Sequence, residues 1–158
     1  MRAGDLAQSF ETVTPDTEAM AAAQFMAAAR LPGLIVCGDD QRPYTIVPGS
    51  QVLRFLIPDY LQKTPALARA LDERASEDLL RKLAHTTVRD LLPHPQDLHE
   101  LPVVDVQATP LEVAAVMARM HSPVVAVVDE EGGSGRVVGA ITASQLLEHL
   151  LPPREAQS

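Results

Sequence analysis

The feature that most constrains this sequence is an internal repeat, because the segment 50–58 recurs at 144–152. Self-similarity at a fixed spacing predicts that one supersecondary unit has been duplicated and that the copies pack together. With small gaps the match extends backwards to the start of the chain, so the whole sequence consists of two copies of one unit. The matches are Ser50-Gln51-Val52-Leu53 with Ser144-Gln145-Leu146-Leu147, Leu56-Ile57-Pro58 with Leu150-Leu151-Pro152, Pro32 with Pro123, Asp39 with Asp129, Ala21-Ala22 with Ala114-Ala115, Val13 with Val106, and Asp5-Leu6 with Asp90-Leu91.

Each copy predicts the elements β-α-β-β-α in the same order. Short apolar runs rich in β-branched residues predict buried strands, and the turn-rich segments between them predict a hairpin. The closing helix has leucines at 146, 147, 150 and 151, a spacing that predicts one buried face. The fold class is therefore α/β (α+β), with two repeats. The expected strands are Val13, 34–37 and 44–47 in the first copy, and 103–106, 124–128 and 136–141 in the second copy.

The first helix of each copy is rich in alanine and poor in charge. Between Leu111 and Met120 the only charged residues are Glu112 and Arg119, which predicts a helix buried nearly all round. One small unit cannot surround such a helix, so we expect it to pack on its own sheet and also on the partner repeat or on a second subunit. The pattern therefore predicts a homodimer.

The repeat boundaries divide the chain into a first copy at 1–58, a helical connector at 59–85, a second copy at 86–152 and a tail at 153–158. The connector mixes leucines with charged residues, which predicts one or two amphipathic helices. It is either a surface connector or a partner-binding surface. Residues 93–97 predict a loop.

Composition excludes several function classes. The 158 residues carry a net charge of −8, only 3% of them are aromatic, and none is Trp, which argues against nucleic-acid binding. No apolar segment is long enough to span a membrane, and no leader is expected. The single cysteine, Cys37, predicts a buried thiol in a cytoplasmic protein. The histidines lack metal-ligand spacing and no catalytic motif is present, so we expect neither a metal site nor an enzyme.

The repeated motif resembles the cystathionine-β-synthase (CBS) domain, which usually occurs as a tandem pair. That family's pattern is a small residue and Pro before a valine-rich strand, an Asp-containing turn, and then Gly, two apolar residues, Thr, two variable residues, Asp and Leu. The second copy carries Ser122-Pro123-Val124-Val125, Asp129 and Gly139-Ala140-Ile141-Thr142-Ala143-Ser144-Gln145-Leu146. The more divergent first copy carries Leu31-Pro32-Gly33-Leu34, Asp39 and Thr45-Ile46-Val47-Pro48-Gly49-Ser50-Gln51-Val52.

The resemblance implies a pseudo-twofold pair of repeats, dimers, and clefts that hold adenine nucleotides such as AMP, ADP or ATP as regulatory ligands. The family's ribose-binding Asp is replaced by Gln51 and Gln145, whose neutral amides are weaker acceptors for ribose hydroxyls. The Thr at the phosphate-facing turn is retained as Thr142 and is Pro48 in the first copy. The candidate ligand-binding residues are Arg30, Pro32, Gln51, Thr109, His121, Ser122, Pro123, Val124, Thr142, Ser144 and Gln145.

Each candidate also has a purely structural interpretation. Thr142 and Gln145 form the pattern of a helix capping box, and Arg30 follows a helix whose carbonyl dipole favours any cation. Two functions therefore stay open. One is a stand-alone regulatory or sensor module that binds an adenine nucleotide between the repeats and acts on an unknown effector protein. The alternative is a ligand-free dimerisation and protein-interaction module.

Overall fold

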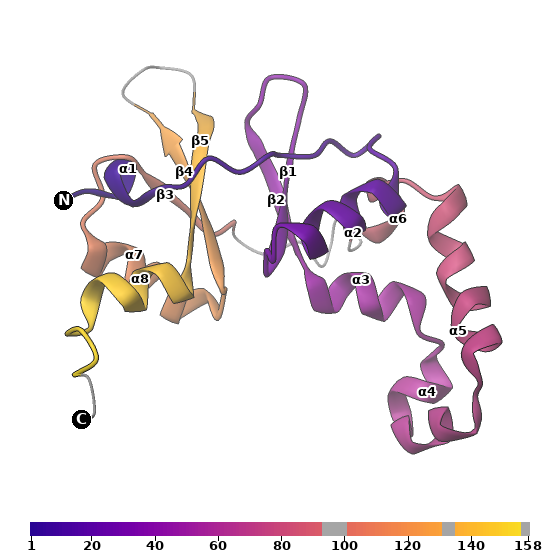
Figure 1. The fold of residues 1–158 in the computed structure, drawn as a ribbon. Helices are drawn as coiled ribbons and strands as arrows, with labels where there is room; N and C mark the ends of the chain where they lie inside the picture. The colour runs from indigo at the N-terminus through magenta and orange to yellow at the C-terminus, as the bar shows by residue number, and fades with distance from the viewer. Residues whose placement is uncertain (93–100, 131–134, 156–158) are drawn as a thin grey trace. The chain divides into compact units, whose positions relative to one another are not determined.

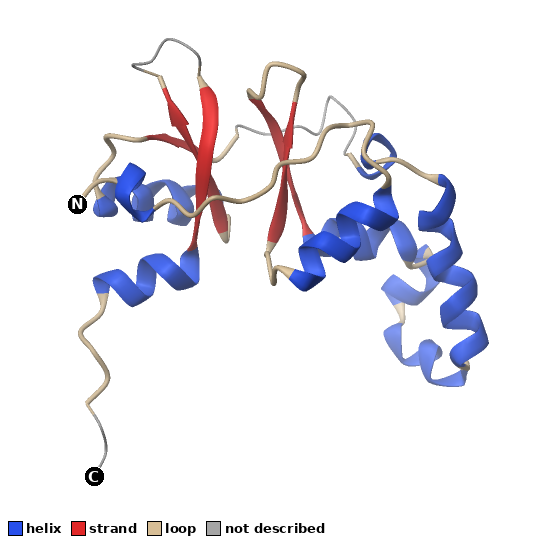
Figure 2. Ribbon diagram, turned by 45° about the horizontal axis from the view of Figure 1, so that its top comes forward, coloured by secondary structure: helices blue, strands red, loops and turns tan. Residues whose placement is uncertain are grey.

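A computed structural model describes residues 1–92, 101–130 and 135–155 (Figure 1). The chain forms two compact units, each assembled from separate stretches of sequence. The first unit contains Met1–Glu11, Cys37–Tyr44 and Glu100–Ser158, and the second contains Thr12–Val36 and Thr45–His99. Helices and strands are mixed in the β-α-β-β-α order, which confirms the predicted fold class (Figure 2).

The first unit contains most of the second repeat. Its three-stranded sheet has the order β3-β4-β5, in which β3 (Val103–Asp105) runs parallel to β4 (Val124–Asp129), and β4 runs antiparallel to β5 (Arg136–Thr142). The helices α7 (Pro110–Met120) and α8 (Ala143–Leu150) complete the repeat. β4 is buried on both faces, because its five residues from Val124 to Val128 are at most 3% exposed. The apolar run therefore forms the predicted two-sided strand.

The carboxylate of Asp105 fastens the end of β3 to the turn after β4. Asp105 accepts hydrogen bonds from the backbone N–H of Gln107 at 2.8 Å and of Glu130 at 3.2 Å. These backbone donors hold the pKa of Asp105 below its ordinary value because they stabilise the charged form. The contribution to stability is present above the unfolded pKa and is lost as the pH falls through the lower folded pKa.

The chain's N-terminal segment also belongs to this unit. The short helix α1 (Ala3–Leu6) donates from Ala3 N–H to Ala108 O at 2.8 Å and from Gly4 N–H to Val106 O at 2.9 Å. Gln8 then pairs with Ala140 of β5 through two backbone hydrogen bonds of 2.9 Å. The opening segment of the first repeat thus completes the core of the second repeat.

The second unit contains most of the first repeat. Helix α2 (Ala19–Ala28) leads to β1 (Gly33–Cys37), which pairs with β2 (Pro43–Pro48), and α3 (Gly49–Leu56) follows. The opening strand that the sequence predicts at Val13 is reduced to a single parallel bridge between Val13 and Val36. Cys37 is buried, as predicted, at 2% exposure.

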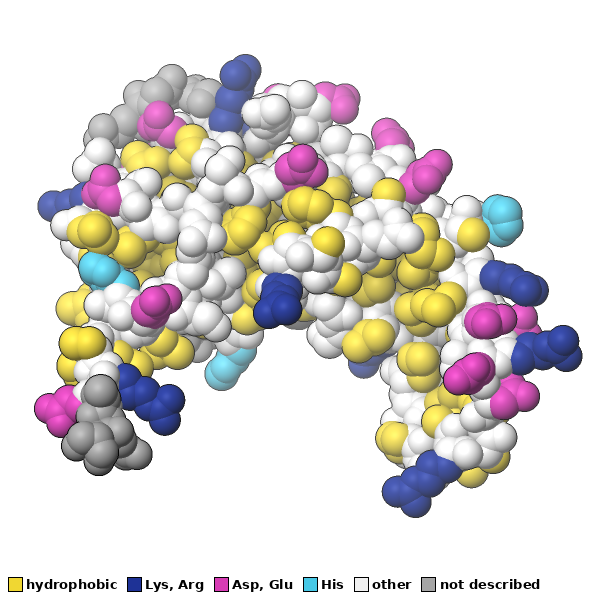
Figure 3. All heavy atoms as spheres, viewed as in Figure 1, with side chains coloured by type: hydrophobic (Ala, Val, Ile, Leu, Met, Phe, Trp, Pro, Cys, Tyr) yellow, Lys and Arg dark blue, Asp and Glu magenta, His cyan; other side chains and the backbone are white. Residues whose placement is uncertain are grey.

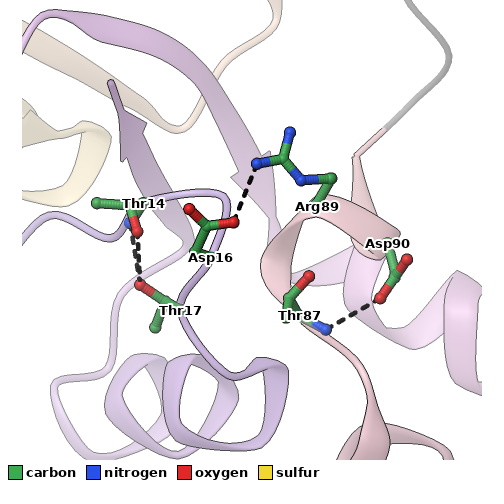
Figure 4. Close-up of polar contacts among 6 residues, drawn as sticks. All are labelled: Thr14, Asp16, Thr17, Thr87, Arg89 and Asp90. Carbon is green, nitrogen blue, oxygen red and sulfur yellow. Dashed lines mark hydrogen bonds and ion pairs between the residues drawn. The ribbon is translucent and has the colours of Figure 1, made fainter. Parts of the chain in front are cut away.

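The opening segment of the second repeat completes this second unit in the same way. Helix α6 (Val88–Leu91) donates from Val88 N–H to Thr17 O at 2.8 Å and from Arg89 N–H to Pro15 O at 2.9 Å. Figure 4 shows the accompanying ion pair of 3.0 Å between Arg89 and Asp16. Thr87 N–H donates to Asp90 at 3.0 Å and closes the turn. The repeat boundaries 1–58 and 86–152 stay a prediction about the duplication. The compact units do not coincide with them, because each unit includes the opening segment of the other repeat.

Three features of the helices in the single chain differ from the sequence predictions. On α7 only Val113 and Met117 are buried, while Ala115 and Ala118 are exposed. On α8 only Leu146 is buried, because the three-stranded sheet covers one side of the helix. The connector forms four short helices rather than one or two: α4 (Asp59–Lys63), η1 (Pro65–Ala70), α5 (Glu73–Leu80) and η2 (Arg81–His85).

Two helix breaks explain the short connector helices. Pro65 begins η1, and the side chain of Asp72 caps α5 by accepting from Ala75 N–H. The expected loop at 93–97 lies outside the described residues, as does the end of the tail. Within the described chain, no helix combines the length and the apolar character needed to cross a bilayer.

Gly139 tests the docking of the N-terminal segment on β5. A Cβ at this position would lie 2.6 Å from the carbonyl oxygen of Gln8 and 3.1 Å from Ala7 Cβ. We expect Gly139→Ala to lower the free energy of unfolding by about 1–3 kcal/mol, because backbone atoms must shift. Urea titration measures the loss. Gly38→Ala is the matched control, since its Cβ would meet only a side-chain oxygen of Asp40, at 3.3 Å, and equal stability of both variants would contradict the docking.

Candidate functional site

The helix that precedes the central strand ends in the same unusual backbone conformation in both repeats. Arg30 has φ 54° and His121 has φ 50°, so both lie in the left-handed region that favours glycine. In each case the next residue closes the turn: Leu31 N–H donates to Met26 O at 3.0 Å, and Ser122 N–H donates to Met117 O at 3.1 Å.

Basic side chains are therefore placed at two strained positions that correspond in the duplication. Both side chains are exposed, and within the described chain neither makes a hydrogen bond or an ion pair through its side chain. Strain of this kind costs of order 1–3 kcal/mol and persists where the surroundings enforce it. The sequence predicted both residues as candidates but missed this geometry. The sequence signal for this geometry was that Arg30 and His121, which directly follow the two helices, stand where a helix commonly ends in Gly.

A backbone hydrogen bond joins the strand entry to the last helix in each repeat. Ala143 N–H donates to Pro123 O at 2.9 Å, and Gly49 N–H donates to Pro32 O at 3.0 Å. The first turn of α8 or α3 thus lies beside the proline that begins the strand. In the second repeat this contact, with the Val124–Thr142 pair of the sheet, brings Pro123, Val124 and Thr142 together.

Thr142 and Gln145 satisfy each other as a capping box at the start of α8. Gln145 N–H donates to Thr142 Oγ1 at 3.3 Å, and Thr142 N–H donates to Gln145 Oε1 at 3.0 Å. The Thr142 hydroxyl also lies 3.2 Å from the same amide oxygen. The structural interpretation of these two residues is confirmed, and their role in ligand binding stays a prediction.

The first repeat lacks this arrangement. Pro48 occupies the cap position of α3 and provides no side-chain hydrogen bond. Gln51, which corresponds to Gln145, donates from Nε2 to Leu91 O at 3.4 Å and so reaches α6 instead. The two motifs are therefore unequal in polar groups, as their sequences indicate.

The remaining candidates are less closely associated with this cluster. Ser122 Oγ donates to Val124 O at 2.6 Å, which uses its hydroxyl locally. Thr109 caps the start of α7 by accepting from Glu112 N–H at 3.2 Å. It lies at the opposite end of an 11-residue helix from His121, about 16 Å along the axis. Ser144 is exposed in the first turn of α8.

Metal-ligating side chains do not gather within residues 1–92, 101–130 and 135–155, where no group of three His, Cys, Asp or Glu could hold an ion. The polar groups that do converge are the hydroxyl of Thr142, the amide of Gln145 and the N–H groups at the start of α8. Such a set can hydrogen-bond an anionic or hydroxylated ligand.

The fold and its repeated strand-to-helix corner define a tandem module of β-α-β-β-α units. A family model described as the CBS domain matches residues 86–152. A CBS domain-containing protein of unknown function from Kribbella flavida is 45% identical, with a TM-score of 0.79, and the match covers 96% of this chain and 99% of that chain. The chain therefore belongs to the CBS-domain family, and the resemblance seen in its motifs is confirmed.

More distant structures share the fold. CBSX2, a CBS-pair protein of Arabidopsis thaliana, was solved in complex with AMP and is 20% identical, with a TM-score of 0.62 and 94% of each chain covered. A conserved CBS domain protein of unknown function from Thermoplasma acidophilum is 22% identical, with a TM-score of 0.63, and the match covers 96% of this chain and 70% of that chain. None of the curated proteins compared with this chain matches it. CBS-domain proteins are regulatory nucleotide-binding modules.

The capping box at the start of α8 can be tested by stability alone. Thr142→Val removes the acceptor for Gln145 N–H, so we expect the free energy of unfolding to fall by about 1 kcal/mol. Chemical denaturation measures this change. Ser144→Ala, in the same helical turn but exposed, should leave stability within about 0.5 kcal/mol of the wild type. A Thr142→Val variant as stable as the wild type would show that the cap contributes nothing.

Proposed function

We propose that this chain is a regulatory module that binds an adenine nucleotide, with the second repeat's motif making the principal contacts. The observation that carries the proposal is the corner in which Pro123, Val124 and Thr142 meet, beside the start of α8. CBSX2, which has the same fold, was solved with AMP. The roles below follow from the chemistry of each side chain, and none of them is catalytic.

The second repeat offers more polar groups to a nucleotide than the first. The Thr142 hydroxyl and the exposed Ser144 hydroxyl can donate to phosphate oxygens, and the Gln145 amide can hydrogen-bond ribose hydroxyls. Exposed His121 supplies a positive charge for a phosphate in the second repeat, on a chain of net charge −8, and Arg30 holds the corresponding position in the first repeat. An amide in place of a carboxylate predicts weaker ribose binding than an Asp would give.

The alternative function, a ligand-free interaction module, is favoured by one observation. Thr142 and Gln145 already satisfy each other's hydrogen bonds, so a nucleotide must compete with an existing capping box. In that case the module would act on its effector through its surfaces alone. The buried Cys37 and the absence of any membrane-crossing helix among the described residues accord with the cytoplasmic site of action that we propose.

Thermal unfolding with AMP, ADP and ATP separates the two functions. A nucleotide at about 100 times its dissociation constant stabilises the fold by about 2.7 kcal/mol, a shift of several degrees. We expect His121→Ala and Gln145→Ala each to reduce that shift, measured against the variant's own unliganded melting temperature. Gln51→Ala is the matched control in the first repeat and should keep most of it.

Two outcomes would decide against this assignment. If Gln51→Ala abolished the shift and Gln145→Ala did not, the principal site would lie in the first repeat. If none of the three nucleotides changed the melting temperature at millimolar concentration, the ligand-free interaction module would stand instead.

The proposed module acts as a homodimer. The outer face of α8 exposes Leu147, Leu150 and Leu151 at 53%, 40% and 59%, and Figure 3 shows apolar side chains over this helix. The exposed alanines of α2 and α7 add small side chains that permit close helix packing. Apolar surface of this kind in a soluble protein is a site of association.

A charged residue on α8 tests the homodimer. We expect sedimentation to show a wild-type dimer at micromolar concentration and a folded monomer for Leu147→Lys, because the lysine cannot be desolvated without a partner. Leu67→Lys, on the equally exposed η1, is the control and should remain dimeric. A monomeric wild type would overturn the proposal.

A further inference from the structure

The connector helices create a pocket that the CBS repeat alone would not have. Residues of α3, α4 and η1 together line an open pocket of about 460 Å³. The pocket lies within one compact unit, and its volume falls in the range of about 300–1,000 Å³ that holds small molecules. It is lined by Ser50, Gln51, Leu53, Arg54, Ile57, Leu61, Gln62 and Pro65.

The wall of this pocket is fastened in place by an amide that caps α3. Gln62 Nε2 donates to Ile57 O at 2.7 Å and to Arg54 O at 3.1 Å, so it satisfies carbonyls at the end of the helix. Leu61 beside it is only 4% exposed. These hydrogen bonds hold Gln62 at the end of α3 and so help to position this wall of the pocket.

The lining combines an apolar surface with one positive charge. Leu53, Ile57, Leu61 and Pro65 supply the apolar part, and Leu53 remains 60% exposed. Arg54 is the only charged residue in the lining, and within the described chain no carboxylate lies within 4.0 Å of its guanidinium. Arginine presents a planar fork that matches a carboxylate through two parallel hydrogen bonds.

The sequence around the pocket is locally basic. Between Arg54 and Ala70 the chain carries Arg54, Lys63 and Arg69 against the single carboxylate of Asp59, although the whole chain has a net charge of −8. The connector beyond Ala70 adds Asp72, Glu73, Glu77 and Asp78, so the attraction for an anion comes from Arg54 in the lining itself. The apolar lining, in turn, favours a ligand with a hydrophobic body.

We propose that this pocket binds a small amphiphilic carboxylate, with its carboxylate on Arg54 and its apolar body along Leu53, Ile57 and Pro65. The lining contains no aromatic ring on which a base could stack and a single cation, which is insufficient for a polyphosphate. Arg30 and Pro32, the first repeat's other candidate nucleotide residues, are not among the lining residues. The pocket shares Gln51 with the first repeat's candidates but contains none of the second repeat's residues, so it is separate from the principal nucleotide site proposed above and goes beyond it.

Calorimetric titration of the full chain with decanoate tests the proposal. We expect saturable binding, with about tenfold or greater weakening in Arg54→Gln, because a charge-assisted pair is lost. Arg69→Gln, on η1 but not in the lining, is the matched control and should bind as the wild type does. Leu53→Asp should abolish binding without unfolding the chain, since Leu53 is exposed, and a thermal melt checks its fold.

Three results would overturn the proposal. Decanoate could fail to bind at millimolar concentration, or Arg54→Gln could bind it as tightly as the wild type. Displacement of decanoate by AMP would show instead that the pocket belongs to the nucleotide site. Unchanged decanoate binding in Gln145→Ala, a variant chosen to weaken the nucleotide site, would support the two sites as independent.

Discussion

The exchange of opening segments is the constraint on which the rest of this structure depends. Each compact unit needs backbone hydrogen bonds from the segment that begins the other repeat: Ala3 and Gly4 bond to Ala108 and Val106, and Val88 and Arg89 bond to Thr17 and Pro15. A buried backbone group without a partner costs more than a hydrogen bond gains. The carbonyl groups just before α7 and α2 therefore take their partners from a distant segment, which makes each repeat depend on the other.

The candidate site is built on strand-to-helix corners that these units support. A proline carbonyl accepts from the first turn of the last helix, and a basic residue two positions earlier holds a left-handed conformation. The same hydroxyl and amide that a nucleotide would need also cap α8. Under the proposed function, a nucleotide would have to replace the bonds between Thr142 and Gln145 with bonds of its own.

The duplication has produced two equivalent helices with different surroundings. The outer side of α3 is partly covered by α4 and η1, which leaves a pocket with Arg54 in its lining. On α8 the corresponding position is Glu148, and the neighbouring leucines are exposed. Opposite charges at matching positions and unequal exposure show that the two helices have diverged despite their common fold.

The sequence by itself determined the duplication, the β-α-β-β-α order, the buried strands β1 and β4 and the capping box, because each follows from local periodicity or from residues three positions apart. Tertiary structure alone decided which segment completes which unit, since the partners of Ala3 and Val88 lie far along the chain. It also decided how much of α7 and α8 is buried, because alanine and leucine fit equally well against a sheet or against a second molecule. The pocket beside Arg54 depends on where α4 and η1 lie relative to α3, and no periodicity in the sequence predicts that placement.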